Sequence, residues 1–235
     1  MCGRYSLFAS PEAIEERFGA TFAEAFGPRY NAAPSQPLPV VGDDRDAEIR
    51  TMEWGLVPPW ADGRDEGGFI NARAETVADK PSFREAFHQD GAGVGRCLVL
   101  ADGFYEWAET DEGKQPYRVT LAEDRPFAMA GLWASFEPAS AQAGLGEFGG
   151  DGPAGPDAVE TFTIVTTEPN ATVADLHHRM AVILPEGRER EWLTADPEAA
   201  AGLLEPYDGE MRAYPVSDAV NDPANDAPAV AEPLE

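Results

Sequence analysis

The segment Cys97–Ala108, with the sequence CLVLADGFYEWA, combines two β-strand patterns with one carboxylate set among aromatic rings. Its first four residues are apolar and favour a short buried strand, and Phe104–Ala108 favours a second strand. Another strand-like run, Tyr117–Leu121, follows a turn at residues 112–113. The sequence therefore predicts an antiparallel hairpin that places Glu106 between two aromatic side chains.

Other short apolar or alternating segments predict more strands. Alternation of apolar and polar residues, bounded by turn residues, is typical of strands with one buried face. The expected strands outside the hairpin are Leu38–Val41, Glu48–Val57, Phe127–Phe136, Glu160–Thr167 and Ala181–Leu184.

Helices are expected where capping residues precede a helical apolar pattern. Ser10-Pro11-Glu12 is a strong helix start, because Ser caps the first turn, Pro fits the first position and an acid complements the dipole. Gly19 is expected to end this helix. The other expected helices are Ser82–His88, Ala171–His178, Arg188–Leu193 and Pro197–Leu204. This mixture without regular β-α alternation predicts an α+β fold dominated by antiparallel sheet.

The charge of the chain is strongly unbalanced. Its 235 residues include 43 Asp+Glu against 17 Lys+Arg, for a net charge of −26. Such a field repels phosphates over about 10 Å at ordinary salt, and nucleic-acid proteins usually carry a basic patch. Taken alone, the charge disfavours an anionic partner. High acid content with scarce lysine also suggests adaptation to molar salt, as in a halophile, where screening shortens to about 3 Å. An ordinary acidic protein is the alternative.

Several classes of protein are disfavoured by the remaining composition. No apolar run approaches the roughly 20 residues that span a bilayer, and the first residues lack a secretory pattern. Two cysteines, Cys2 and Cys97, support neither a disulfide framework nor a four-cysteine zinc site. We expect a cytoplasmic monomer with no metal and no cofactor.

Cys2 is the most informative single residue. If Met1 is removed, Cys2 has a free amine of pKa about 8 beside a thiol of pKa about 8.5. A 1,2-aminothiol matches an aldehyde, because the amine forms an imine and the thiol then closes a thiazolidine ring. An internal cysteine cannot do this, because its nitrogen is an amide. The alternative is an incidental cysteine near a frayed terminus.

Three other polar residues stand out against apolar surroundings. Asn71 follows the strand-like pair Phe69-Ile70, and a Glu106 carboxyl buried among aromatics would have a raised pKa suited to proton transfer. Glu106 could instead pair with a structural arginine. His177, next to His178, could act as a general acid or base, or could be a capping or surface histidine.

The chain resembles the SRAP family (SOS response-associated peptidase) in blocks that occur in order along the sequence. Together these blocks are far more specific than any one of them. They are MCGRY (1–5), YNAAP (30–34), WGLVPPW (54–60), NARAET (71–76), RCLV (96–99), ADGFYEW (101–107), GLW (131–133), TFTIVTT (161–167) and HHRM (177–180). PVS (215–217) and VN (220–221) resemble the last family block.

The resemblance implies one domain over residues 2–226, dominated by antiparallel, barrel-like β-sheet with flanking helices. Within it, the Gly-, Ala- and Pro-rich stretch 139–157 is expected to be a flexible surface insertion, and residues 227–235 an acidic tail. The implied function is DNA repair: binding of abasic sites in single-stranded DNA and a covalent crosslink through Cys2.

The resemblance also assigns roles to individual residues. Cys2 is the nucleophile, Asn71 positions it and bonds the sugar, Glu106 moves protons, and His177 protonates the sugar ring oxygen or a leaving group. The expected DNA contacts are phosphates for Arg4, Arg73 and Arg179 and base stacking for Trp60 and Trp107.

Three activities remain open at this point. The imine could eliminate and cleave the strand as a lyase instead of closing the thiazolidine ring. A cysteine with a histidine also suits a thiol peptidase, with removal of Met1 as its most modest form. A reader that binds modified single-stranded DNA without a covalent bond is the third. In all three, the negative charge belongs to the outer surface, and we expect a local cationic groove of Arg4, Arg73 and Arg179 near Cys2.

Overall fold

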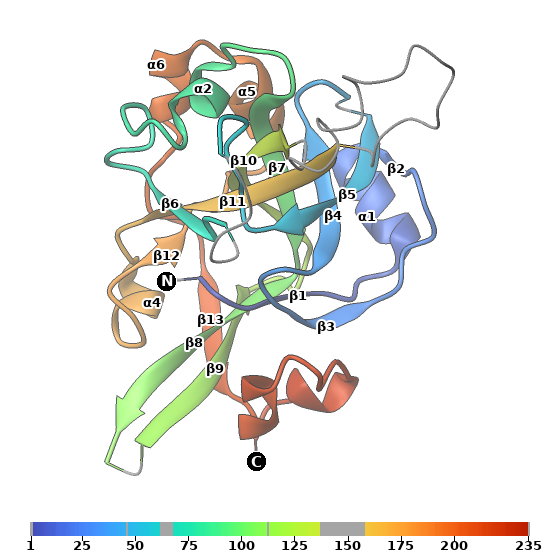
Figure 1. The fold of residues 1–235 in the computed structure, drawn as a ribbon. Coiled ribbons are helices and arrows are strands. Elements are labelled where there is room, and N and C mark those ends of the chain that lie inside the picture. The colour runs from blue at the N-terminus through green and yellow to red at the C-terminus, as the bar shows by residue number, and fades with distance from the viewer. Residues whose placement is uncertain (1, 46, 62–67, 112, 137–157, 235) are drawn as a thin grey trace.

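The computed structural model describes residues 2–45, 47–61, 68–111, 113–136 and 158–234. Its centre is a closed ring of five strands, in which antiparallel neighbours run in the order β5, β4, β7, β10, β11. Parallel pairing of β11 with β5, at Phe162 and Trp54, closes the ring (Figure 1). These strands are β4 (Pro37–Gly42), β5 (Glu48–Trp54), β7 (Val94–Ala101), β10 (Phe127–Phe136) and β11 (Val159–Thr167).

A second sheet packs beside the ring and contains the predicted hairpin. Its strand order is β13, β9, β8, β1, β3, with antiparallel pairing throughout. Figure 1 shows the β8–β9 hairpin extending away from the ring toward the C-terminal segment. The strands are β1 (Tyr5–Leu7), β3 (Arg29–Ala32), β8 (Gly103–Thr110), β9 (Gly113–Leu121) and β13 (Met211–Pro215).

Three short strands extend the ring. β2 (Thr21–Phe22) pairs in parallel with β5. At the carboxyl end of β11, β6 (Asn71–Arg73) pairs in parallel and β12 (Met180–Ala181) pairs antiparallel, so that both strands flank the same few residues of β11.

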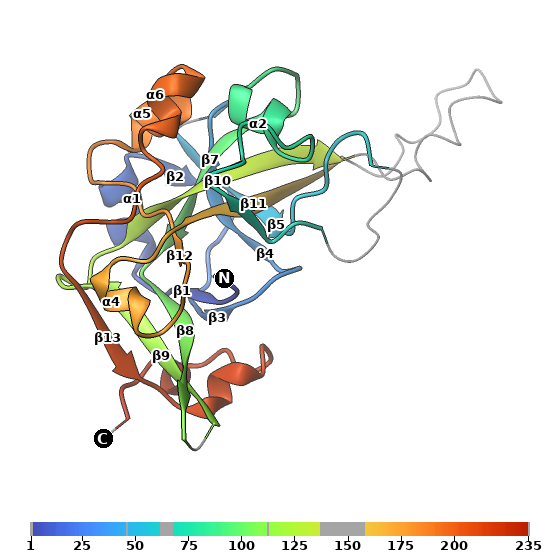
Figure 2. The same ribbon diagram turned by 90° about the vertical axis from the view of Figure 1, so that its left-hand side faces the viewer.

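The helices are short, and most lie toward one end of the ring (Figure 2). α1 begins as expected, with Ser10 accepting from the Ala13 amide, and it ends at a left-handed Gly19. Ile14 of α1 is buried in the cluster that packs against the ring. The helices are α1 (Pro11–Phe18), α2 (Arg84–His88), α4 (Ala171–Ala174), α5 (Glu189–Thr194) and α6 (Pro197–Ala201), with 3₁₀ turns η2 (Asp218–Asn221) and η3 (Pro228–Val230).

Some expected elements are shorter in the structure. The helix predicted over Ala171–His178 ends at Ala174, because the amides of Leu176 and His177 both bond the Val173 carbonyl in a tight turn. This turn directs the chain into β12. The predicted Ala181–Leu184 strand loses regular pairing after Ala181, and the helix predicted to Leu204 ends at Ala201.

The segment predicted as an acidic tail, residues 227–235, is described as far as Leu234. Val230 is 2% exposed and Ala231 8% exposed, and the Leu234 amide bonds the Pro215 carbonyl at 2.9 Å. Residues 227–234 therefore pack on the domain as part of it. The insertion predicted at 139–157 lies outside the described residues.

The predicted fold class is confirmed: a sheet-dominated α+β domain with a barrel-like ring and a few helices. None of the helices in the described part of the chain has the length and apolarity to cross a membrane.

Gly131 lies on β10 at the centre of the ring and offers a test of ring packing. A Cβ at this position would lie 2.7 Å from Val99 Cγ2 and 2.8 Å from Cys97 Sγ. We expect Gly131→Ala to lower the free energy of unfolding by about 1–3 kcal/mol, because a packed core accommodates an added methyl poorly.

Urea denaturation measures this loss. Gly27→Ala is the control, because nothing lies within 4 Å of a Cβ there, and it should stay within about 0.5 kcal/mol of wild type. Equal stability of the two variants would contradict the packing of the ring.

Candidate active site around Cys2

Cys2 lies three residues before the start of β1 and is completely buried. Its carbonyl accepts a hydrogen bond from Asn71 Nδ2 at 2.9 Å. Asn71 is the first residue of β6, opposite Ile164 of β11. Its Oδ1 atom is buried and accepts no hydrogen bond from the described residues. The predicted pair of Cys2 and Asn71 is thus brought together, with one amide oxygen left to accept from a ligand.

Glu106 reaches the same region from the second sheet. Pairing of β8 with β1 joins the Tyr105 amide to the Arg4 carbonyl at 2.9 Å, and Glu106 follows with only 2% exposure. Burial raises the pKa of the Glu106 carboxyl to about 8, so it is largely protonated at neutral pH. Burial, with the nearby Glu106 carboxyl, raises the pKa of the Cys2 thiol to about 12.

His177 sits in the turn between α4 and β12. Its Nδ1 atom lies 3.0 Å from the amide nitrogen of Arg179 and 3.1 Å from the Arg179 carbonyl oxygen. The neighbouring ring of His178 is 4.3 Å away between centroids. Burial lowers the pKa of His177, and the positive charge of the chain's amino terminus adds to this lowering. That charge also opposes the rise in the pKa of Glu106, so both residues lie within electrostatic reach of the amino-terminal end.

The three predicted arginines differ in what their guanidinium groups contact. Arg73 is exposed on β6, two residues from Asn71 and therefore on the same face of the strand. Arg4 is half-buried and donates from Nη1 to Asn31 Oδ1 at 3.1 Å and to the Val220 carbonyl at 2.9 Å. The guanidinium of Arg179 is buried and ion-paired with Glu75. Arg73 is thus the exposed guanidinium of the three, and the phosphate groove stays a prediction.

The two predicted stacking tryptophans lie on exposed parts of the fold. Trp60 is 58% exposed. Trp107 is half-buried on β8, and its Nε1 donates to Asn221 Oδ1 at 2.8 Å. The C-terminal turn η2 therefore fixes the edge of the Trp107 ring.

Two residues in the quoted motifs had no predicted role and hold other parts of the fold in place. Asn31, 1% exposed, donates to the carbonyls of Val220, Asp222 and Asn225 and so holds the C-terminal segment against β3. Glu75 holds Arg179. The only sequence signal for either was its place in a block shared with the family.

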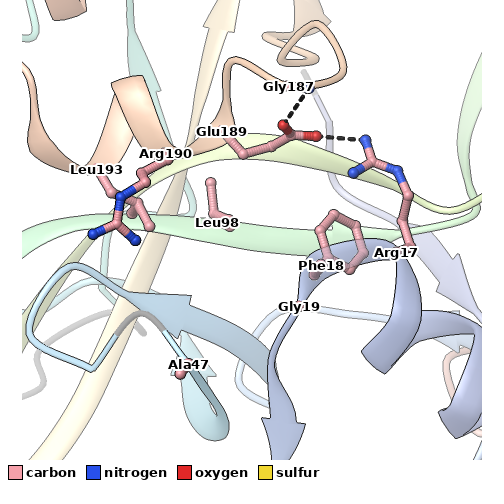
Figure 3. A pocket seen from close by; sticks show the side chains of 9 residues that line it. All are labelled: Arg17, Phe18, Gly19, Ala47, Leu98, Gly187, Glu189, Arg190 and Leu193. Atoms are coloured by element: carbon pink, nitrogen blue, oxygen red, sulfur yellow. Dashed lines mark hydrogen bonds and ion pairs between the residues drawn. The ribbon is translucent and has the colours of Figure 1, made fainter.

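Other features of the described residues do not suggest competing chemistry. They contain no group of three or more His, Cys, Asp or Glu side chains arranged to hold a metal ion. Cys97 is buried in the ring. One pocket between α1 and α5, with a volume of about 290 Å³, contains an ion pair of Arg17 with Glu189 (Figure 3). It shares no residue with the Cys2 site.

Comparison with known proteins identifies the family. The family described as SOS response associated peptidase (SRAP) matches residues 1–223, so the chain belongs to it. It is 39% identical to "Abasic site processing protein YoqW" of Bacillus subtilis, with 99% of each chain covered. It is 30% identical to "Abasic site processing protein HMCES" of Gallus gallus, over 89% of this chain and 67% of that one. A solved protein of Bacteroides thetaiotaomicron has the same fold, with a TM-score of 0.82, 25% identity and full coverage of both chains.

The raised pKa of Glu106 predicts a pH-dependent stability. The folded state keeps the proton up to about pH 8, whereas an unperturbed carboxyl releases it near 4.5. The contribution of Glu106 to the free energy of unfolding is therefore complete below pH 4.5. It falls by about 1.4 kcal/mol for each pH unit between 4.5 and 8. We expect Glu106→Gln to remove this decline.

Urea denaturation of both proteins from pH 5 to pH 8.5 measures the difference. Glu109→Gln is the matched control on the same strand, because its side chain is 78% exposed. If the stability curves of wild type and Glu106→Gln ran parallel, Glu106 would not be held protonated.

Proposed function

We propose that this protein processes abasic sites in single-stranded DNA and crosslinks to them through Cys2 after Met1 is removed. The observation that carries the proposal is the hydrogen bond from Asn71 to the Cys2 carbonyl, with the buried Glu106 carboxyl close enough to help raise the pKa of the Cys2 thiol. The names of the relatives, "Abasic site processing protein", support it.

The chemistry of the crosslink needs one acid and one base. The Cys2 amine attacks the C1′ aldehyde of the opened sugar, and the resulting carbinolamine loses water to give an imine. Glu106 supplies the proton that leaves with the hydroxyl group. The nitrogen keeps its remaining proton, so the imine is cationic when the hydroxyl leaves as water. The thiol then adds to the imine carbon, its proton returns to the Glu106 carboxylate, and the nitrogen becomes the neutral ring amine. The sum is one thiazolidine and one water.

The pKa values suit this sequence. A carboxyl of pKa about 8 carries a proton at pH 7 for the dehydration, and its conjugate base is strong enough to help a thiol of pKa about 12. The same high thiol pKa disfavours a peptidase that uses a standing thiolate, so we assign peptidase chemistry no role beyond a contribution to Met1 removal.

Other residues have supporting roles in the proposal. Asn71 Nδ2 holds the Cys2 carbonyl, and its Oδ1 accepts from the amine or a sugar hydroxyl. His177 protonates the sugar ring oxygen as the aldehyde is released. Arg73 contacts a phosphate, and Trp60 and Trp107 stack beside the lesion.

Replacement of Cys2 tests the proposal directly. We expect Cys2→Ala to give no heat-stable adduct with abasic single-stranded DNA, because the thiazolidine needs the thiol. An imine that borohydride traps should remain, because the amine is intact. Intact mass spectrometry of the wild-type adduct should give protein lacking Met1 plus DNA minus one water.

Cys97→Ala is the control, since it removes the other thiol and should leave the adduct in place. A heat-stable adduct in Cys2→Ala would contradict the proposal. Reversible binding that is identical in Cys2→Ala and wild type, with no adduct in either, would favour the non-covalent reader.

The net charge of −26 gives a second prediction, on salt. At molar salt, counterion release adds little to DNA affinity, so binding rests on short-range contacts and the covalent bond. We expect crosslinking to persist in molar potassium chloride and the melting temperature to rise from 0.1 to 2 M, because screening relieves self-repulsion. Loss of crosslinking just above physiological salt would refute the high-salt interpretation.

A further inference from the structure

The guanidinium of Arg179 is directed into the protein. Both of its terminal nitrogens contact the Glu75 carboxylate, with Nη2 to Oε2 at 3.0 Å. Nη2 also donates to the Thr166 carbonyl at 2.5 Å. The Arg179 side chain is 9% exposed, and the hydrogen bond from Arg179 lowers the pKa of Glu75. Glu75 is thus ionised and holds the guanidinium in a two-point contact.

The backbone of Arg179 contacts His177. The same ring nitrogen, Nδ1, lies within hydrogen-bonding distance of both the amide nitrogen and the carbonyl oxygen of Arg179. A neutral Nδ1 accepts from the N–H, and a protonated Nδ1 donates to the carbonyl oxygen. The Arg179 peptide can therefore hold the ring in either protonation state.

One carbonyl connects this turn with the strand that carries Asn71. The Thr166 carbonyl of β11 accepts from Arg179 Nη2 and also from the Ala74 amide at 2.9 Å. Ala74 directly follows β6, and Glu75 follows Ala74. The Glu75–Arg179 contact therefore connects the segment after β6 with the turn before β12.

We propose that Glu75 is a positioning residue that acts through Arg179 to fix the His177 ring relative to Cys2. The proposal rests on the function proposed above for His177. It gives Arg179 an internal role beside the phosphate contact that the sequence predicts.

The two roles of Arg179 predict opposite results for Glu75→Gln. If Arg179 positions His177, loss of the ion pair lets the turn move, and crosslinking slows without loss of DNA affinity. If the Glu75 contact instead only keeps Arg179 away from phosphate, the variant frees a cation, and affinity for DNA rises.

The experiment compares binding and chemistry separately. Affinity is measured with single-stranded DNA that carries a tetrahydrofuran abasic analogue, which has no aldehyde and cannot crosslink. The crosslinking rate is measured with the natural abasic site. For Glu75→Gln we expect affinity within about twofold of wild type and a crosslinking rate about tenfold lower, because a small misplacement of a catalytic group is costly. Tighter binding with an unchanged rate would overturn the proposal.

The matched control is Glu189→Gln, which makes the same substitution in another ion pair. Glu189 of α5 contacts Arg17 of α1, as Figure 3 shows, and their side chains are 11% and 15% exposed. This pair shares no residue with the Cys2 site, so the crosslinking rate should match wild type. An equal loss of rate in the control would show that general destabilisation, rather than positioning, explains the effect.

A double-mutant cycle shows whether Glu75 acts through His177. We expect Glu75→Gln to slow crosslinking in the wild-type background and to change nothing further in His177→Ala. Additive losses would overturn the proposal.

Nitrogen NMR of the His177 ring tests positioning without DNA. The Nδ1 and Nε2 shifts should move in Glu75→Gln and stay in place in Glu189→Gln. Unchanged shifts in Glu75→Gln would refute the proposal. If the shifts move but the wild-type protein forms no adduct, the proposed function fails while the positioning role stands.

Discussion

The parallel pairing of β11 with β5 is the interaction on which the rest of the structure depends. It joins the last strand of the ring to an early one, and so it closes the barrel-like sheet. It also leaves the carboxyl end of β11 to be flanked by β6 and β12, which bring Asn71 and the turn with His177 to the same place. The second sheet adds Cys2 and Glu106 through the pairing of β1 with β8.

Burial shifts the pKa values of the side chains in this site and also lowers the stability of the folded protein at high pH. A carboxyl and a thiol close together in apolar surroundings both favour their neutral forms, which is why both pKa values rise. The protonated Glu106 is a usable acid at neutral pH only because water is excluded from it. The same exclusion makes the folded state less stable as pH rises, so stability and the proposed proton transfer depend on one side chain.

Some of the few positive charges of the chain are used inside it. Arg96, Arg118 and Arg179 are among the buried arginines, and their guanidinium groups bond carbonyls, carboxylates and amides of the fold. The acidic side chains that outnumber them lie mostly on the surface. Net charge therefore describes the surface, whereas the site depends on short-range contacts made by individual residues.

Local patterns in the sequence determined much of the fold. The caps at Ser10 and Gly19, the hairpin around Glu106 and the alternation in β10 and β11 all depend on neighbouring residues, which a sequence displays directly. The aminothiol chemistry proposed for Cys2 could also be inferred from the sequence, because it requires only that Cys2 become the first residue. The tertiary structure alone decided that Arg179 faces Glu75 rather than solvent, that Asn31 holds the C-terminal segment and that residues 227–234 pack on the domain. These contacts join residues far apart in the chain, and their partners are chosen by strand pairing and burial rather than by local pattern.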